Sequence, residues 1–515
     1  MVRKLSSLQL PLFDDPAFAA LQDELRASMH GLLGDLCDEL DKLYRRPVRA
    51  LRVPVGFFRE MGHALRLESF AGWKVVGWVE GLNDLVYFLD LQEQFRREQD
   101  ARGFAKQFFA ECEEKFYEHS YRDELFPSGE PDPAGLARRL DDLCVRLVRQ
   151  VTQEALFLAP GLPCAWAART GRTAWVVPYD VGPNFELAEL PGTISVGLEG
   201  DYLEPRGRLR GLMGRPSCRA DLVIRPGSLA MRINRRQFPI LTGGVLAARE
   251  WFHHPSILVG PDGPTLGPLL RYGRDREPRH VVPAPRGLAR RIARALAAIE
   301  AAWPEGARLF TMLTTRIVPL KAKGVVSFSY RHRPGLSFIN CFDRDDLDLI
   351  DDLIHENSHH QLNLLLRKDV LYHKDRNQEI FYSPWRRSLR PLRGILHATF
   401  TFTMGAILFE KISTWAKSGK ATLSPAQILR ARFRCLEEVA SVRYSLEDLE
   451  HATKLGWLTQ AGWELVRSLK REIEKVENRI KTHEWAIMRS KYGRELRAHR
   501  KELDTARQTY GPVRD

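Results

Sequence analysis

The sequence lacks paired cysteines: its seven cysteines are dispersed through 515 residues, and no Cys-x-x-Cys pair occurs. This absence excludes a zinc ribbon and a disulfide framework, because both need cysteines at fixed spacings. Dispersed single cysteines are typical of reduced thiols. The first fourteen residues also lack an apolar run of signal-peptide length before Asp14 and Asp15. We therefore expect a cytoplasmic protein.

Long hydrophobic runs are also missing. No stretch approaches the ~18 uncharged apolar residues of a transmembrane helix, so we expect no membrane span. No zinc-finger, RNP or basic-zipper pattern accompanies the formal net charge of +13, and we expect no nucleic-acid partner. Seven arginines between 271 and 291, interrupted by prolines, instead suit a solvated basic linker or contact with an anionic peptide.

The remaining composition is that of an ordinary globular protein, with 44% hydrophobic and 28% charged residues. Hydrophobic periodicity predicts an α+β fold that is predominantly helical. We divide the chain into a helical N-terminal region (1–158), a mixed α/β region with a candidate peptide-binding role (159–285), a metal-binding catalytic region with a zincin-like helical core (286–420) and a helical C-terminal region (421–515).

Local patterns predict the individual elements. Apolar residues at helical spacing predict helices at 79–99, 104–121, 133–157, 286–303 and 470–508. Alternating and β-branched runs predict strands at 173–177, 193–198, 220–224, 229–233, 308–319 and 324–329. A hairpin turn is expected at 225–228, and the glycine pair 243–244 is expected to lead into a helix.

The most informative stretch is His355-Glu356-Asn-Ser-His359, an H-E-x-x-H run inside a helix predicted for 345–367. Residues four apart lie on one face of a helix, so His355 and His359 can direct two imidazoles at one metal ion. Glu356 could reach a metal-bound water or hold a neighbouring group in place. His360 points elsewhere on the helix and is not expected to bind the same ion.

A working site needs a third ligand from elsewhere in the chain. A metzincin would have glycine three residues after the second histidine, where this sequence has Leu362. A gluzincin would use a downstream glutamate, for which Glu379 and Glu410 are the candidates. His397, which apolar helical neighbours could hold against the first helix, is the third possibility. These alternatives remain open from spacing alone.

Just before His397, the segment 382–391 carries several arginines between two prolines, with Trp385 among them. Arginine binds carboxylates with two parallel hydrogen bonds and remains charged at any working pH. The arginines that lie near the metal motif in sequence are Arg386, Arg387, Arg390 and Arg393. We predict that this loop binds a carboxylate.

Together these motifs resemble the HExxH-motif peptide-modification proteins of ribosomal peptide natural-product clusters. The resemblance covers residues 300–410 and is carried by the segments 315–319, 334–338, 355–359, 382–386, 390–392 and 394–397. It implies an Fe(II)- and 2-oxoglutarate-dependent hydroxylase, a dioxygenase that modifies a side-chain β-carbon in a ribosomally synthesised precursor peptide. It also implies that His355, His359 and His397 are the metal ligands and that Arg386 or Arg390 binds the cosubstrate.

Two other functions fit the residues. H-E-x-x-H by itself suggests zinc, so a zinc metallopeptidase with Glu356 as general base is the first alternative. A peptide-binding protein without catalysis is the second, although an intact H-E-x-x-H motif argues against it. Metal content and a requirement for 2-oxoglutarate distinguish the two enzymes.

Overall fold

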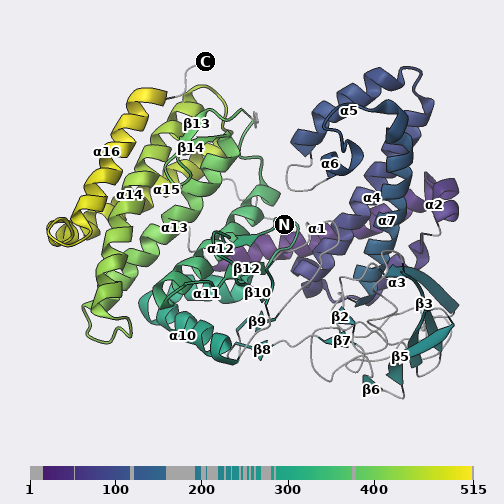
Figure 1. Ribbon diagram of the computed structural model, residues 1–515, viewed down its shortest axis with the longest axis horizontal. Helices are drawn as coiled ribbons and strands as arrows, with labels where there is room; N and C mark the ends of the chain where they lie inside the picture. Colours follow the sequence, from purple (N-terminus) through teal and green to yellow (C-terminus); the bar gives the residue numbers. More distant parts are fainter. Residues whose placement is uncertain are drawn as a thin grey trace.

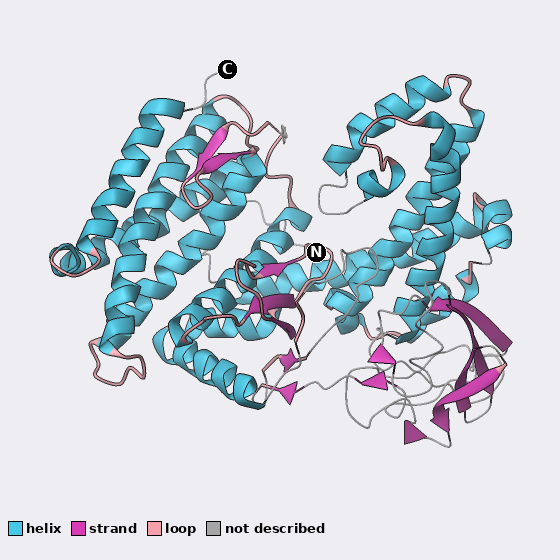
Figure 2. Ribbon diagram, viewed as in Figure 1, coloured by secondary structure: helices cyan, strands magenta, loops and turns pink. Residues whose placement is uncertain are grey.

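The computed structural model describes five long stretches of the chain, residues 15–51, 53–115, 121–157, 286–373 and 378–512. Between 192 and 282 it describes shorter segments (192–198, 204–205, 218–225, 228–233, 235–242, 245–246, 252–253, 257–259, 263–267 and 280–282). These segments are predominantly helical, with small sheets in the middle of the chain, as the sequence predicts (Figure 2).

The N-terminal region is helical throughout its described residues. Its elements are α1 (Asp15–Lys42), α2 (Arg45–Leu51), α3 (Val55–Ala64), the 3-10 helix η1 (Leu67–Ala71), α4 (Trp73–Arg97), α5 (Ala101–Lys115), α6 (Tyr121–Leu125) and α7 (Pro133–Phe157). α4 is apolar on most of its surface, so it is buried between α1 and α7 (Figure 1). The single helix predicted for 104–121 corresponds to two described helices, α5 and α6.

An antiparallel sheet follows, in the order β1-β3-β4-β5-β6. Its strands are β1 (Gly192–Leu198), β3 (Cys218–Arg225), β4 (Ser228–Ile233), β5 (Arg236–Thr242) and β6 (Val245–Leu246). Arg225 pairs with Ser228, which confirms the predicted hairpin. The helix expected after 243–244 does not begin at Val245 and Leu246, which pair with β5, and residues 247–251 lie outside the described residues. The strand predicted at 173–177 lies outside the described residues. β2 (Glu204–Pro205) and β7 (Phe252–His253) form a separate pair.

A mixed sheet in the order β11-β12-β10-β9-β8 lies near the middle of the molecule (Figure 1). It consists of β8 (Ile257–Leu258), β9 (Thr265–Leu266), β10 (Arg316–Leu320), β11 (Phe328–Ser329) and β12 (Leu336–Asn340). β10 and β12 are parallel, and β11 is antiparallel to β12. α10 (Arg286–Ala302) and α11 (Pro304–Leu313) precede β10.

The prediction of a strand over 308–319 is wrong in its first half. Pro304 stands in the first turn of α11, where its missing N–H loses no hydrogen bond. Gly306, Leu309, Phe310 and Leu313 are buried on one face, which is a helical repeat. The strand therefore begins only at Arg316. The second predicted strand, 324–329, is likewise shortened to Phe328–Ser329.

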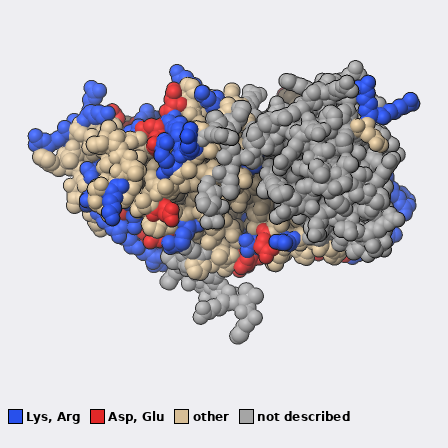
Figure 3. Space-filling model, turned by 90° about the horizontal axis from the view of Figure 1, so that it is seen from below, with Lys and Arg blue, Asp and Glu red and all other residues tan. Residues whose placement is uncertain are grey.

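The metal motif lies on α12 (Asp346–Lys368), and α13 (Leu392–Ala416) packs along it. The hairpin of β13 (Phe381–Ser383) and β14 (Ser388–Arg390) joins the two helices. α14 (Pro425–Lys454), α15 (Gln460–Met488) and α16 (Gly493–Tyr510) complete the C-terminal region. The segment 470–508, which the sequence predicts as one long helix or a helical hairpin, contains the end of α15 and most of α16. Lysines and arginines are scattered over the surface on this side, with acidic residues between them (Figure 3).

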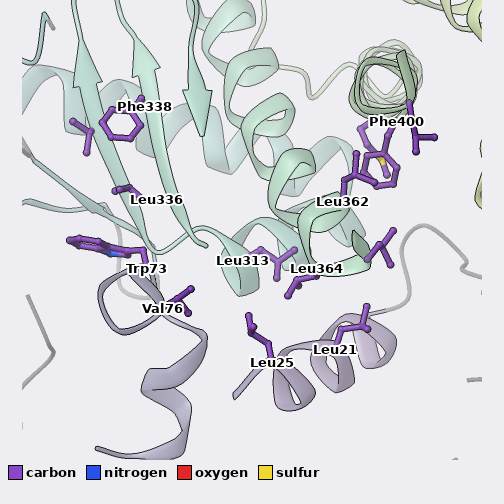
Figure 4. Packing of buried hydrophobic residues seen from close by; sticks show 14 of the residues in the cluster. Leu21, Leu25, Trp73, Val76, Leu313, Leu336, Phe338, Leu362, Leu364 and Phe400 are labelled. Atoms are coloured by element: carbon purple, nitrogen blue, oxygen red, sulfur yellow. The ribbon is translucent and has the colours of Figure 1, made fainter. Parts of the chain in front are cut away.

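One hydrophobic core connects the N-terminal helices to the metal-binding region. Figure 4 shows Leu25 of α1 pointing towards Leu313 of α11 and Leu364 of α12, with Val76 of α4 nearby. α13 is the one described helix that is long and apolar enough to cross a membrane. Most of it is buried against α12, α14 and α15, as in the core of a soluble protein.

Candidate metal centre

Polar contacts fix where α12 begins and how it is rotated about its axis. Asp345 caps the helix by accepting a hydrogen bond from the N–H of Asp348, whose carboxylate accepts one in return. The amide of Asn357 is buried and donates to Thr314 Oγ1 at 2.9 Å. His360 faces β12, with its Nε2 3.0 Å from Ser337 Oγ. His360 is thereby directed into the sheet, away from the other histidines.

His355 and His359 project from the opposite side of α12 towards α13. Their ring centroids are 5.1 Å apart, as expected for residues separated by one helical turn. His397, in the second turn of α13, brings a third ring to within 6.0 Å of that of His359. All three residues are half-buried. The interface of α12 and α13 thus carries three imidazoles, of which His355 and His359 bring potential ligand atoms within 4.8 Å of each other, whereas His397 lies outside that group.

Desolvation keeps these imidazoles neutral in the metal-free protein. Burial lowers the pKa of His355, although the carboxylate of Asp351 partly opposes this. Burial and the neighbouring histidines lower the pKa of His359 well below its usual value. Burial, with Arg331 and Arg393, lowers the pKa of His397 to about 4. Neutral imidazole is the form that coordinates metal ions, so no deprotonation is needed at neutral pH.

Glu356 is buried beside these rings. One of its carboxylate oxygens and one nitrogen of each of His355 and His359 all lie within 4.8 Å of one another. Oε2 of Glu356 has no hydrogen-bond partner among the described residues. Burial raises the pKa of Glu356 to about 8, and the Ser329 hydroxyl on β11 partly offsets this. A nearby cation would stabilise the ionised carboxylate and lower that pKa.

The two glutamates considered as third ligands lie in different surroundings. Glu379 is exposed in the segment before β13. Glu410 is buried, but it pairs with Arg479 of α15 at 3.3 Å and accepts from Thr414. Glu410 is also thirteen residues beyond His397, which corresponds to about 20 Å along α13. Neither glutamate belongs to the cluster formed by the histidines.

The arginine loop forms the turn of the β13–β14 hairpin. Arg386 is exposed in this turn, and its charge acts on His355. Arg390 is exposed on β14, and its Nε would lie 3.5 Å from a Cβ at Gly394, one turn before His397. Neither guanidinium forms an ion pair with the described residues. Arg387 differs, since its Nε pairs with Glu502 of α16 at 3.0 Å.

Several residues at this centre were not singled out from the sequence. Arg331, in the loop between β11 and β12, adds its positive charge to that of Arg393 near His397. Asp351 lies one turn before His355 on α12 and pairs with Arg434 of α14 at 3.1 Å. Phe402 of α13 packs against His355. The spacing of Asp351 from His355 was the one available signal, because the other contacts join distant segments.

The donor set fits a divalent transition metal. Three neutral imidazoles suit zinc, iron, copper or nickel, whereas calcium and magnesium require mainly oxygen donors. The unpartnered oxygen of Glu356 could accept a hydrogen bond from a ligand of the metal. Unpaired arginines at the edge could bind a negatively charged cosubstrate.

No protein-family model matches the chain, and no curated protein has a significantly similar sequence.

Proposed function

We propose that this protein is an Fe(II)- and 2-oxoglutarate-dependent hydroxylase of a side-chain β-carbon in a ribosomally synthesised precursor peptide. The observation that carries the proposal is that the rings of His355 and His359 lie 5.1 Å apart, with the ring of His397 6.0 Å from that of His359 and with Arg386, which forms no ion pair with the described residues, acting on His355. Three protein ligands leave coordination positions for other groups, as in the non-haem iron oxygenases. Bound iron would supply the oxidation chemistry.

Each residue has a separate role in this proposal. The three imidazoles would hold the metal and leave the site with a positive charge, which favours the dianion 2-oxoglutarate. Arg386 or Arg390 would bind its distal carboxylate. Glu356 would accept a hydrogen bond from a metal ligand and orient it. The surrounding apolar residues, including Phe402, would exclude water from one side of the site.

A zinc metallopeptidase is the second candidate. It is favoured by the position of the Glu356 carboxylate, within 4.8 Å of nitrogens of His355 and His359. In that reaction Glu356 would take a proton from the metal-bound water. The carboxylate would have to be ionised for this, and a bound cation would favour the ionised form by opposing the burial that raises its pKa to about 8. The peptidase reaction has no role for Arg386 and Arg390.

The two reactions leave different products. The first experiment is metal analysis of the protein purified without oxygen. The second is co-expression with a precursor peptide, followed by measurement of the mass of the peptide. The hydroxylase predicts iron, a requirement for 2-oxoglutarate and the gain of one oxygen atom by an intact peptide. Cleavage of the backbone, independent of 2-oxoglutarate and supported by zinc, would contradict the proposal and favour the peptidase.

A further inference from the structure

A line of side-chain contacts joins α14 to the ring of His355. Oε2 of Glu438 accepts a hydrogen bond from Nε1 of Trp385 at 2.7 Å. The indole of Trp385 stacks on Phe402, with ring centroids 4.3 Å apart and an interplanar angle of 6°. Phe402 meets the ring of His355 at 5.0 Å and 62°. Four separate elements of the fold contribute to this line.

Each carboxylate oxygen of Glu438 accepts a hydrogen bond. Its side chain is 4% exposed, and its Oε1 accepts a hydrogen bond from Nη2 of Arg434 at 3.2 Å. The same nitrogen of Arg434 also reaches Oδ2 of Asp351 at 3.1 Å. A buried carboxylate with both oxygens bonded cannot rotate without leaving a partner unpaired. It therefore provides a fixed acceptor for the indole N–H.

Trp385 also determines where the hairpin turn lies. It is followed directly by Arg386, and Arg387 has a φ of 53°, in the left-handed region that non-glycine residues adopt only with strain. Such a turn needs contacts outside itself to hold one conformation. The hydrogen bond to Glu438 and the stack on Phe402 are two such contacts. One side chain thus connects the arginine turn to the packing around His355.

We propose that Trp385, held by Glu438, is a positioning residue for the metal centre. Its indole fixes Phe402 against His355, so that the imidazole keeps one orientation, and it fixes Arg386 on the same side of the site. The sequence offers no sign of this, because Trp385 and Glu438 are separated by 53 positions. The inference rests on the proposed metal centre, and it holds for either reaction at that centre.

Binding of Co(II) to the metal-free protein tests this role without any catalytic assay. Trp385→Phe keeps an aromatic ring on Phe402 but removes the N–H donor. Glu438→Met removes the acceptor at similar length. Each should weaken Co(II) binding by about tenfold or more and change the visible absorption of the bound ion, as expected for partners that orient a metal ligand. The double variant should bind no more weakly than either single variant, because both remove the same contact.

Trp485→Phe is the matched control, because it makes the same substitution at an exposed tryptophan of α15 that stacks on Arg489. It should bind Co(II) within about twofold of the wild-type protein. If Glu438→Met does not fold, as judged by circular dichroism, Trp385→Phe decides the question alone. Wild-type Co(II) affinity and absorption in Trp385→Phe would overturn the positioning role and leave the metal centre intact. A wild-type protein that binds no Co(II) would overturn both.

Discussion

Arg333 and Glu154 form a buried ion pair between the loop that precedes β12 and the end of α7. The two guanidinium–carboxylate contacts are 2.8 and 3.1 Å, and the side chains are 0% and 2% exposed. A Cβ at Gly77 of α4 would collide with the guanidinium, so a larger residue there would have to displace Arg333 from the pair. The pair connects the N-terminal helices to the loop that carries Arg331, beside His397.

Glu154→Gln should therefore destabilise the protein strongly. It leaves the buried guanidinium of Arg333 without its carboxylate partner, which costs about 3–5 kcal/mol in comparable cases. Arg333→Met combined with Glu154→Leu removes both charges and should lose less stability than the single variant. Denaturant-induced unfolding measures both effects. The control is Lys475→Met, which removes an exposed pair with Glu472 and should change stability by no more than about 1 kcal/mol. If Glu154→Gln loses no more free energy of unfolding than the control does, the buried pair does not stabilise the protein as predicted.

Substitution of each histidine of the cluster by alanine should abolish metal binding. His355→Ala and His359→Ala remove the pair on α12, and His397→Ala removes the ring from α13. The measurement is the metal content of each purified, folded variant. His360→Gln is the control, because His360 bonds to β12 and should leave the metal content unchanged. Full metal occupancy in His397→Ala would show that the third ligand is another residue.

Loss of an arginine at the edge of the site should weaken the binding of 2-oxoglutarate more than that of the peptide. For Arg386→Ala or Arg390→Ala we expect the apparent requirement for 2-oxoglutarate to rise about tenfold or more, as for a lost charge-assisted hydrogen bond. Arg331→Ala should share this effect, since its charge also acts near the imidazoles. Arg387→Ala is the matched control, because its guanidinium pairs with Glu502. If Arg386→Ala, Arg390→Ala and Arg331→Ala all keep the wild-type requirement, the cosubstrate is bound elsewhere.

The stability of the metal-free protein should depend on pH through Glu438. Burial raises its pKa from 4.5 to about 7, despite the opposing effect of Arg434. The folded state thus binds the proton more tightly than the unfolded chain does. The resulting stabilisation is fully present below pH 4.5 and is lost as pH rises through about 7. The difference between the two pKa values corresponds to about 3 kcal/mol in the free energy of unfolding. Glu438→Gln should flatten this part of the pH profile in unfolding experiments, and an unchanged profile would contradict the assignment.

The sequence predicts the helices of this protein better than its strands. Helices such as α7 and α12 follow from apolar residues at helical spacing and from capping residues. The segment 308–313 is helical where a strand was predicted, because a short apolar run fits both structures. The burial of α11 against α10, α12 and α1 and the proline in its first turn decide for a helix.

At the site, local spacing predicts only what one helix can bring together. His355 and His359 lie on the same face of α12 because they are four residues apart. The approach of His397 depends on how α13 packs against α12, which spacing does not specify. Arg331 and Glu438 come from loops and helices far away in sequence, so their contributions depend on tertiary packing alone.

The central claim is that three histidines hold iron in a site that binds 2-oxoglutarate. The most direct test is to load the metal-free protein with Fe(II) in the absence of oxygen and to add 2-oxoglutarate while recording the visible absorption. We predict a new absorption band, saturable with one equivalent of Fe(II) per chain, that is absent from the His359→Ala and His397→Ala variants. Stoichiometric Fe(II) binding with a spectrum that 2-oxoglutarate leaves unchanged would contradict the claim.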